Sequence, residues 1–229
     1  MKKCVVFLLL IAAIPAANAQ LFKIAGQEVG FVYVGPKVGL NFSKFNNWSY
    51  DYFNVKNKTG FQFGVVGEFG FTNKFSVQSE VVIISRGAKG EFNGNEETKK
   101  MPSIAIPVLA RYTFSLLGLK KVYVNGGMYS TMRIGSGEIT YDGGFTEEDY
   151  HWTRFDWGLS FGAGVEYPTD NGIWGVDLRY NLGLVDVYRQ MDENTKSQFR
   201  TFGISVTYKY DFVDLMLRIR KKKLDPDAE

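Results

Sequence analysis

Apolar and polar side chains alternate along most of the chain, so that within each segment every second residue is large and apolar. The stretch FQFGVVGEFGF, residues 61–71, shows the pattern: its phenylalanines share one parity, and Gln62, Gly64 and Glu68 share the other. Successive side chains of a β-strand point to opposite faces of the sheet. The pattern therefore predicts strands with one apolar face and one polar face.

The alternation recurs in eight segments, each long enough for a tilted strand to cross a bilayer, which takes about ten residues. They are residues 32–42, 61–71, 75–86, 103–112, 122–133, 154–167, 174–184 and 202–210. Long connections (43–58, 87–100, 135–152 and 186–198) alternate with short ones (72–73, 115–120 and 168–172). This is typical of outer-membrane barrels, with long loops outside the cell and short turns in the periplasm. The sequence predicts an all-β fold, an eight-stranded antiparallel up-and-down transmembrane β-barrel over residues 20–212.

A soluble eight-stranded barrel of lipocalin type would show the same alternation with its faces inverted. The apolar faces are nearly free of charge, as lipid contact requires, because one Arg or Lys there costs about 2–4 kcal/mol at mid-depth. The polar faces are rich in glycine, serine and charges of both signs, which suits a narrow interior. We therefore expect the apolar faces to meet lipid. Aromatic residues near both ends, such as Trp174, Tyr208, Phe155 and Phe199, predict two interfacial girdles.

The N-terminal segment MKKCVVFLLLIAAIPAANAQ has a basic start, an apolar run and an Ala17-Asn18-Ala19 cleavage signal. Residues 1–19 are therefore predicted to be a secretory signal peptide, and the run is too short to span a bilayer. Without Lys2 and Lys3, the 27 basic residues become 25 against 24 acidic ones, a net charge of +1. Such a balance gives no reason to expect a nucleic-acid partner. The expected location is the cell outer membrane, with outer-membrane lipid as the partner of the apolar face.

Charged side chains of both signs fall on the predicted inward face. Eight-stranded barrels have interiors that side chains just fill, and buried charges must be paired. We expect a salt-bridged plug, with a proton or small-solute path as the alternative. Arg179 should pair with a carboxylate such as Glu80 or Asp156. The full predicted network is Glu68, Glu80, Arg86, Arg111, Arg133, Arg154, Asp156, Glu166, Asp177 and Arg179, with Lys37 and Lys209 on the same face.

No combination of residues predicts catalysis, a cofactor or a metal. The single histidine, His151, lies near Glu147, Glu148 and Asp149, but no serine nucleophile accompanies it. No spacing of His, Cys and carboxylates indicates a metal site. The protein is therefore expected not to be an enzyme.

Aromatic residues concentrate in two of the long loops. Exposed Trp and Tyr side chains there either anchor the barrel at the membrane interface or contact an envelope protein partner or a glycan. The candidates for such contacts are Trp48, Tyr50, Tyr52, His151 and Trp152.

Residues 213–229 follow the last predicted strand and form a basic tail. Leu215, Leu217 and Ile219 precede or interleave with the basic run, so a short amphipathic helix at the periplasmic membrane surface is one expectation, and a solvated end is the other. The basic residues, which would contact anionic headgroups or an acidic partner, are Arg218, Arg220, Lys221, Lys222 and Lys223.

Several segments resemble one known family. They are GPKVGLNFS (35–43), FSVQSEVVIISRGAKG (75–90), IAIPVLARY (104–112), FDWGLSFGAGVEY (155–167) and LRYNLGLVDV (178–187). In this order they resemble the PorT-like outer-membrane β-barrel family of Bacteroidota. The resemblance implies the fold and the location, and the founding member takes part in type IX protein secretion. We therefore expect a non-enzymatic barrel that presents extracellular loops for interaction, with an accessory subunit of a secretion or uptake complex, or a narrow pore, as alternatives.

Overall fold

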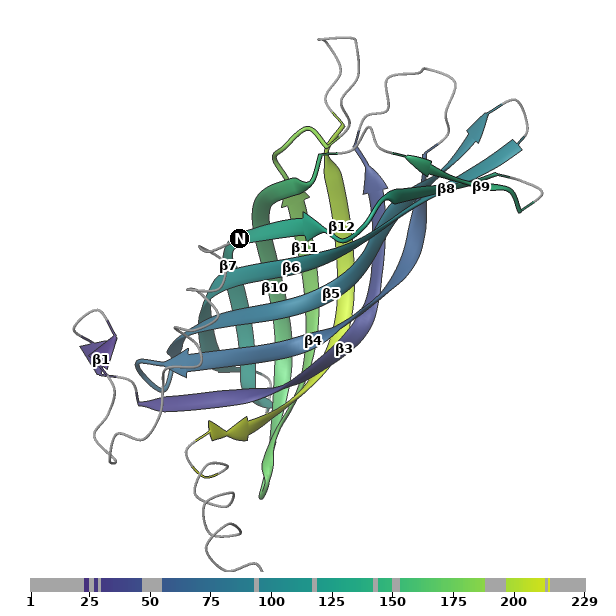
Figure 1. Ribbon diagram of the computed structural model, residues 1–229. Coiled ribbons are helices and arrows are strands. Elements are labelled where there is room, and N and C mark those ends of the chain that lie inside the picture. The colour runs from purple at the N-terminus through teal and green to yellow at the C-terminus, as the bar shows by residue number, and fades with distance from the viewer. Residues whose placement is uncertain are drawn as a thin grey trace, which may run out of the picture.

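The computed structural model describes residues 23–24, 27–28, 30–46, 55–92, 95–116, 119–141, 144–149, 153–187, 197–212 and 214. Eight long strands make up most of its ten-stranded main sheet (Figure 1): β3 (Phe31–Phe45), β4 (Lys56–Gly70), β5 (Phe75–Phe92), β6 (Asn95–Leu116), β7 (Leu119–Arg133), β10 (Phe155–Thr169), β11 (Gly172–Gly183) and β12 (Phe199–Asp211). Two short strands, β1 (Lys23–Ile24) and β2 (Gln27–Glu28), form a separate two-stranded sheet among the described residues. Among the described residues no helix is long and apolar enough to cross a membrane.

The eight long strands close into a barrel. Each pairs with its sequence neighbour in antiparallel fashion, and β12 pairs with β3, so the last strand meets the first. At this seam Val206 lies opposite Val38. The pairing of β5 with β6 completes the ring. Closure leaves no unpaired strand edge in the barrel wall, which is the condition for a sheet to span a membrane. The prediction of an all-β, eight-stranded antiparallel barrel is confirmed.

The two faces of the barrel wall are those that the alternation predicts. On β4, Phe61 is 73% exposed on the outside, whereas Val66 and Glu68 are 1% and 3% exposed on the inside. The same parity holds along the other long strands, and large apolar side chains make up the exposed face. An outer face of this kind is stable only in an apolar solvent.

Inward-facing glycines allow neighbouring strands and side chains to approach closely. A Cβ atom on Gly127 would lie 2.1 Å from the backbone oxygen of Val108 on β6. Its neighbour Gly126 faces outward, and a Cβ atom there would meet only Phe161, at an ordinary 3.6 Å. The enrichment of glycine on the inner parity thus has a steric cause, since the interior has the smaller radius.

The connections 87–100 and 135–152, predicted as loops, contain regular structure. Strands β5 and β6 continue as one hairpin to the pair Phe92–Asn95, and β8 (Gly137–Tyr141) and β9 (Thr146–Asp149) add to the free side of β6. We call this four-stranded extension, residues 87–100 with β8 and β9, the ledge. It projects from one side of the barrel at the upper right of Figure 1. Its sequence lacks the alternation because charged residues such as Glu96, Lys99 and Lys100 occupy both parities.

The ledge marks one end of the barrel, which we call the long-loop end; the opposite end, with the short connections near residues 72, 118 and 170, is the short-turn end. Inside the long-loop end is an apolar cluster, in which the rings of Phe45 and Phe199 lie 4.7 Å apart. Phe199 was expected in the outer aromatic girdle, and this was wrong: it is 2% exposed inside, because it has the inward parity of Thr201 and Gly203. The cluster comprises Phe45, Ala88, Met101, Val187 and Phe199.

Candidate functional site

The middle of the interior holds a four-charge cluster contributed by three strands. Arg179 on β11 contacts Glu80 on β5 at 2.8 Å and Asp177 at 2.9 Å. Lys37 on β3 contacts Glu80 at 2.9 Å and Asp177 at 3.6 Å. Each of the two cations therefore touches both carboxylates. We call this group the middle cluster.

A second four-charge group lies nearer the short-turn end, and we call it the lower cluster. Arg111 on β6 contacts Glu166 on β10 at 2.5 Å and Glu68 on β4 at 3.3 Å. Lys209 on β12 is ion-paired with the same two carboxylates. The hydroxyl of Ser76 also donates to Glu68, at 2.7 Å. The lower cluster thus joins four strands around the barrel.

A separate ion pair, outside both clusters, lies toward the long-loop end. Arg86 on β5 contacts Asp156 on β10 at 2.6 Å. The guanidinium carbon of Arg86 lies 4.3 Å from the centroid of the Phe199 ring, in the apolar cluster. The pair is thereby held beneath an apolar cap, and Asp156 is the partner of Arg86 rather than of Arg179.

Both four-charge clusters are neutral, with two cations and two carboxylates each. In a low-dielectric interior, such local matching is what allows charged groups to be buried at all. Removal of any one member leaves its partners uncompensated. Within the described parts of the chain, no group of three His, Cys, Asp or Glu side chains could hold a metal ion. The arrangement fills and cross-links the interior.

Two of the predicted network residues stand outside these ion pairs. Arg133, the last residue of β7, faces inward and is half-buried, yet its Nε and Nη1 atoms are buried without a hydrogen-bond partner. Arg154 is exposed, which corrects its predicted place in the lumen. It precedes the first residue of β10, at a bend where strand parity no longer directs a side chain into the interior.

The remaining predicted contact residues cannot be placed in this way, because they lie outside the described residues. This applies to the aromatic loop candidates and to the basic tail, and to the signal peptide at residues 1–19 as well. They are Trp48, Tyr50, Tyr52, His151, Trp152, Arg218, Arg220, Lys221, Lys222 and Lys223.

Sequence reasoning singled out the charges and missed the neutral groups that orient them. The hydroxyl of Tyr123 donates to Asp177 at 3.0 Å, and the amide of Asn125 donates to the same carboxylate at 3.2 Å. The Tyr123 ring also lies 3.5 Å below the guanidinium carbon of Arg111, so it bridges the lower and middle clusters. Gln78 donates to Glu80 at 2.6 Å. Tyr123, Asn125 and Gln78 all have the inward parity of their strands, and this is the sequence feature from which their contacts with the charges could have been predicted.

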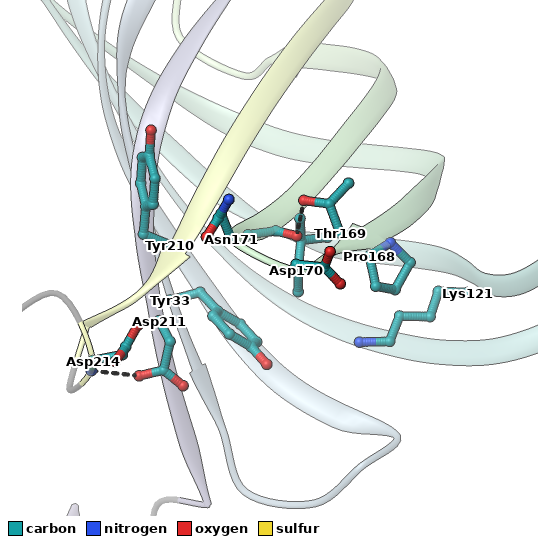
Figure 2. Close-up of a pocket in the computed structure, with 11 residues that line it drawn as sticks. Tyr33, Lys121, Pro168, Thr169, Asp170, Asn171, Tyr210, Asp211 and Asp214 are labelled. Carbon is teal, nitrogen blue, oxygen red and sulfur yellow. Dashed lines mark hydrogen bonds between the residues drawn. The ribbon is translucent and has the colours of Figure 1, made fainter.

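The short-turn end is hollow where the long-loop end is capped. A pocket of about 300 Å³ is lined by residues from several strands, and Figure 2 shows Tyr33, Lys121 and Asp170 around it, with Asp211 and Asp214 at its edge. A second pocket of about 190 Å³ shares Tyr33 and Lys121 and reaches Glu68 and Glu166 of the lower cluster. The interior therefore opens toward the short turns.

Comparisons with known proteins agree with this architecture. The structure is similar to the crystal structure of Neisserial surface protein A (NspA), with 17% identity over 79% of this chain and 97% of that chain and a TM-score of 0.51. It is also similar to the outer membrane protein OprG from Pseudomonas aeruginosa, with 11% identity, coverage of 83% and 99%, and a TM-score of 0.51. At these identities the likeness shows the fold alone. A search of curated protein sequences found no match.

A family model described as "Outer membrane protein beta-barrel domain" matches residues 18–189, which include seven of the eight barrel strands. A β-barrel domain is what the closed sheet of the structure shows, and an outer-membrane location explains why the outer face of that sheet is apolar. The chain belongs to this outer membrane protein β-barrel domain family, and its location is the outer membrane.

Proposed function

We propose that this protein is a non-enzymatic, non-conducting outer-membrane barrel that presents its long-loop end at the cell surface for interaction. The observation that carries the proposal is the filled interior. Two neutral four-charge clusters and one further ion pair cross-link the strands at three heights. An eight-stranded barrel is just wide enough for side chains to occupy its interior. Such an interior supports a scaffold rather than a channel.

The apolar cluster supports the same conclusion. Phe45 and Phe199 are each 2% exposed inside the long-loop end, and they pack with Met101 and Ala88. An ion entering from that end would meet apolar side chains that offer it no hydrogen bonds, and dewetted apolar constrictions act as closed gates. A narrow pore is therefore the less favoured alternative.

The ledge supplies the surface to be presented. It carries an exposed Phe145 (64%) beside Tyr141, and charged pairs such as Lys100–Glu138 at 3.6 Å. Among the described strands, its outer strand β9 pairs with β8 alone and contributes the acidic residues Glu147 and Glu148. A water-facing sheet with an exposed aromatic and a free edge is a suitable surface for a protein or glycan partner.

Planar-bilayer recordings test the non-conducting part of the proposal. The purified barrel should show no steady conductance, while an open porin in the same bilayers provides the positive control. A double variant, Phe45→Ser with Phe199→Ser, should lose the apolar cap and still show no steady conductance, because the middle and lower clusters continue to fill the interior. A steady large conductance of the unaltered protein would overturn the plugged interior.

Cysteine labelling tests which end faces outward. The single cysteine, Cys4, lies in the predicted signal peptide, so introduced cysteines are unique in the mature chain. Thr146→Cys lies on the ledge and Asn171→Cys in a short turn, and both positions are exposed. A membrane-impermeant maleimide should label only Thr146→Cys on intact cells and both after permeabilisation. The reverse pattern on intact cells would contradict the proposed orientation.

The PorT-like resemblance and the short-turn pocket support an alternative, in which the barrel is an accessory subunit of a secretion (type IX-like) or uptake complex of a Bacteroidota envelope. The pocket would then receive a periplasmic partner at Tyr33 and Lys121. Gentle extraction of native membranes distinguishes the two ideas: a stable stoichiometric partner favours the subunit, and a barrel that purifies alone favours independent presentation. N-terminal sequencing in the same preparation should find a mature chain that starts at Gln20.

A further inference from the structure

Two arginines are neighbours across the β7–β10 ladder at the long-loop end, and among the described residues no ion pair joins either of them to a carboxylate. The register of β7 and β10 pairs Met132 with Phe155, and the amide of Arg133 donates to the carbonyl oxygen of Arg154 at 2.9 Å. The two residues are therefore neighbours across the end of the β7–β10 ladder, with Arg133 facing inward and Arg154 exposed at the bend before β10. Two like charges at neighbouring strand ends repel each other. In the described part of the chain neither guanidinium contacts a carboxylate.

The burial of Arg133 makes this pairing costly. Its Nε and Nη1 atoms are shielded from solvent and have no hydrogen-bond partner. The nearest acidic residue by register is Asp156, diagonal to Arg133 on β10. Its Oδ2 accepts from Arg86 at 2.6 Å and from the Tyr129 hydroxyl at 3.5 Å, and its Oδ1 is buried without a hydrogen-bond partner, yet no ion pair joins it to Arg133 within the described part of the chain. The residue directly opposite Arg133 on β6 is Ser103, whose hydroxyl is neutral. A half-buried guanidinium with two shielded N–H groups and no ion pair among the described residues gains stability from an anion brought from elsewhere.

We infer that Arg133 and Arg154 form a binding site for a phosphate- or sulfate-type oxyanion at the long-loop rim of the barrel. Arg133 supplies a fixed fork of donors from within the wall, and exposed Arg154 closes on the anion from outside. Planar guanidinium groups bind such oxyanions with two parallel hydrogen bonds, and a bound anion turns the repulsion between the two arginines into a bridge. The oxyanion is carried either by a lipid headgroup or by a soluble ligand.

The inference deepens the proposed function, because it names the kind of ligand that the presented end would bind. Its biological meaning rests on the proposed orientation of the barrel. Binding itself depends only on the two side chains and can be measured on the isolated barrel. If cysteine labelling contradicts the orientation, the site still binds oxyanion in vitro; if the site fails to bind, the orientation is unaffected. The two failures are therefore distinguishable.

The first experiment titrates inorganic phosphate into the purified barrel in a nonionic maltoside detergent, with chloride used to hold the ionic strength constant. The Arg133 Nε–H resonance, assigned by its loss in Arg133→Gln, should shift saturably. Arg154→Gln should weaken binding roughly tenfold or more, because a charge-assisted hydrogen bond is lost. Arg200→Gln is the matched control: this arginine bonds to the carbonyl oxygens of Gly183 and Phe199 near the same end and should leave binding unchanged.

The thermal stability of the Arg133→Gln variant, measured with and without phosphate, separates an anion site from a purely structural role of Arg133. In chloride, Arg133→Gln should raise the midpoint temperature of unfolding, because it removes an unpaired buried charge. In saturating phosphate the order should reverse, because only the unaltered barrel gains stability from the bound anion. If Arg133→Gln does not fold, the phosphate titration can still be made on Arg154→Gln, because that substitution changes an exposed residue. No saturable shift in the unaltered barrel, or equal weakening in Arg200→Gln, would overturn the site.

A second experiment identifies the source of the oxyanion. The barrel is inserted into phosphatidylcholine vesicles with and without phosphatidic acid, whose headgroup is a phosphomonoester. If the phosphatidic acid removes the response to soluble phosphate, the site takes a lipid headgroup from the surrounding leaflet. If the response persists, the site takes a soluble ligand. Both results support the site and assign its ligand.

Discussion

The charges in the barrel interior and those at its rim follow different rules. The middle and lower clusters contain four cations and four carboxylates, and every cation contacts both carboxylates of its own cluster. At the rim, Arg133 and Arg154 are neighbours across the β7–β10 ladder, and neither is ion-paired with a carboxylate of the described residues. Deep in the wall an unmatched charge has no solvent to stabilise it, whereas at the rim water and anions are within reach. The difference separates charges that build the barrel from charges available to a ligand.

The largest effect is expected from breaking the middle cluster. Glu80→Ala would leave Lys37 and Arg179 with only Asp177 between them, and loss of one partner from a fully buried pair costs about 3–5 kcal/mol. The free energy of unfolding is measured by urea titration, with the compact and unfolded forms separated by gel mobility. Glu138→Ala is the matched control, because its half-exposed pair with Lys100 contributes at most about 1 kcal/mol. Equal, small losses in both variants would mean that the interior is wet.

The next effect concerns the apolar cap that separates the two regions. Phe199→Ala should destabilise the barrel by about 3 kcal/mol, because it creates a cavity beside Phe45 and removes the ring over which Arg86 lies. Phe202→Ala, on the outer face of the same strand, is the comparison and should cost less in a bilayer, where lipid refills the space. The measurement is the same urea titration in lipid vesicles. A larger loss for Phe202→Ala would place the packing of Phe199 in doubt.

A smaller effect of opposite sign is expected when the rim is made to resemble the interior. Ser103→Asp would set a carboxylate directly opposite Arg133 and should stabilise the barrel by up to about 1 kcal/mol, the value of an opposite-charge cross-strand pair. It should also reduce the response to phosphate, because the guanidinium is already occupied. Ser103→Asn, which has the same shape and no charge, is the control. Destabilisation by Asp beyond that of Asn would show that Arg133 is not available.

The smallest effect is expected from removing the tail. A chain that ends at Phe212 retains β12 in full, since that strand ends at Asp211, and it retains Lys209 of the lower cluster. It should insert with unchanged stability and lose only periplasmic associations. Membrane fractionation and unfolding midpoints check this. Failure to insert would show that residues 213–229 contribute to assembly, and the basic residues would then need a different explanation.

The period-two pattern by itself determined the fold and the orientation of the wall. Strand geometry sends alternate side chains to opposite faces, so the parity of Phe61 and Glu68 was sufficient to place one outside and one inside. The absence of charge on one parity then selected lipid as the outer solvent. These are local properties of each strand, and they need no knowledge of which strands meet across the barrel.

Only the tertiary structure decided which inward charges meet. Parity predicts that Arg179, Asp156 and Glu80 face inward, but it does not predict how far along the barrel axis each one lies. That height depends on the stagger between neighbouring strands as the sheet closes. Arg179 thus contacts Glu80, while Asp156 is left to Arg86. Parity also fails where a strand begins or continues beyond the membrane, as at Arg154 and in the ledge. The unmatched pair at the rim arises from the register of β7 and β10, which brings Arg133 and Arg154 together across 20 intervening residues.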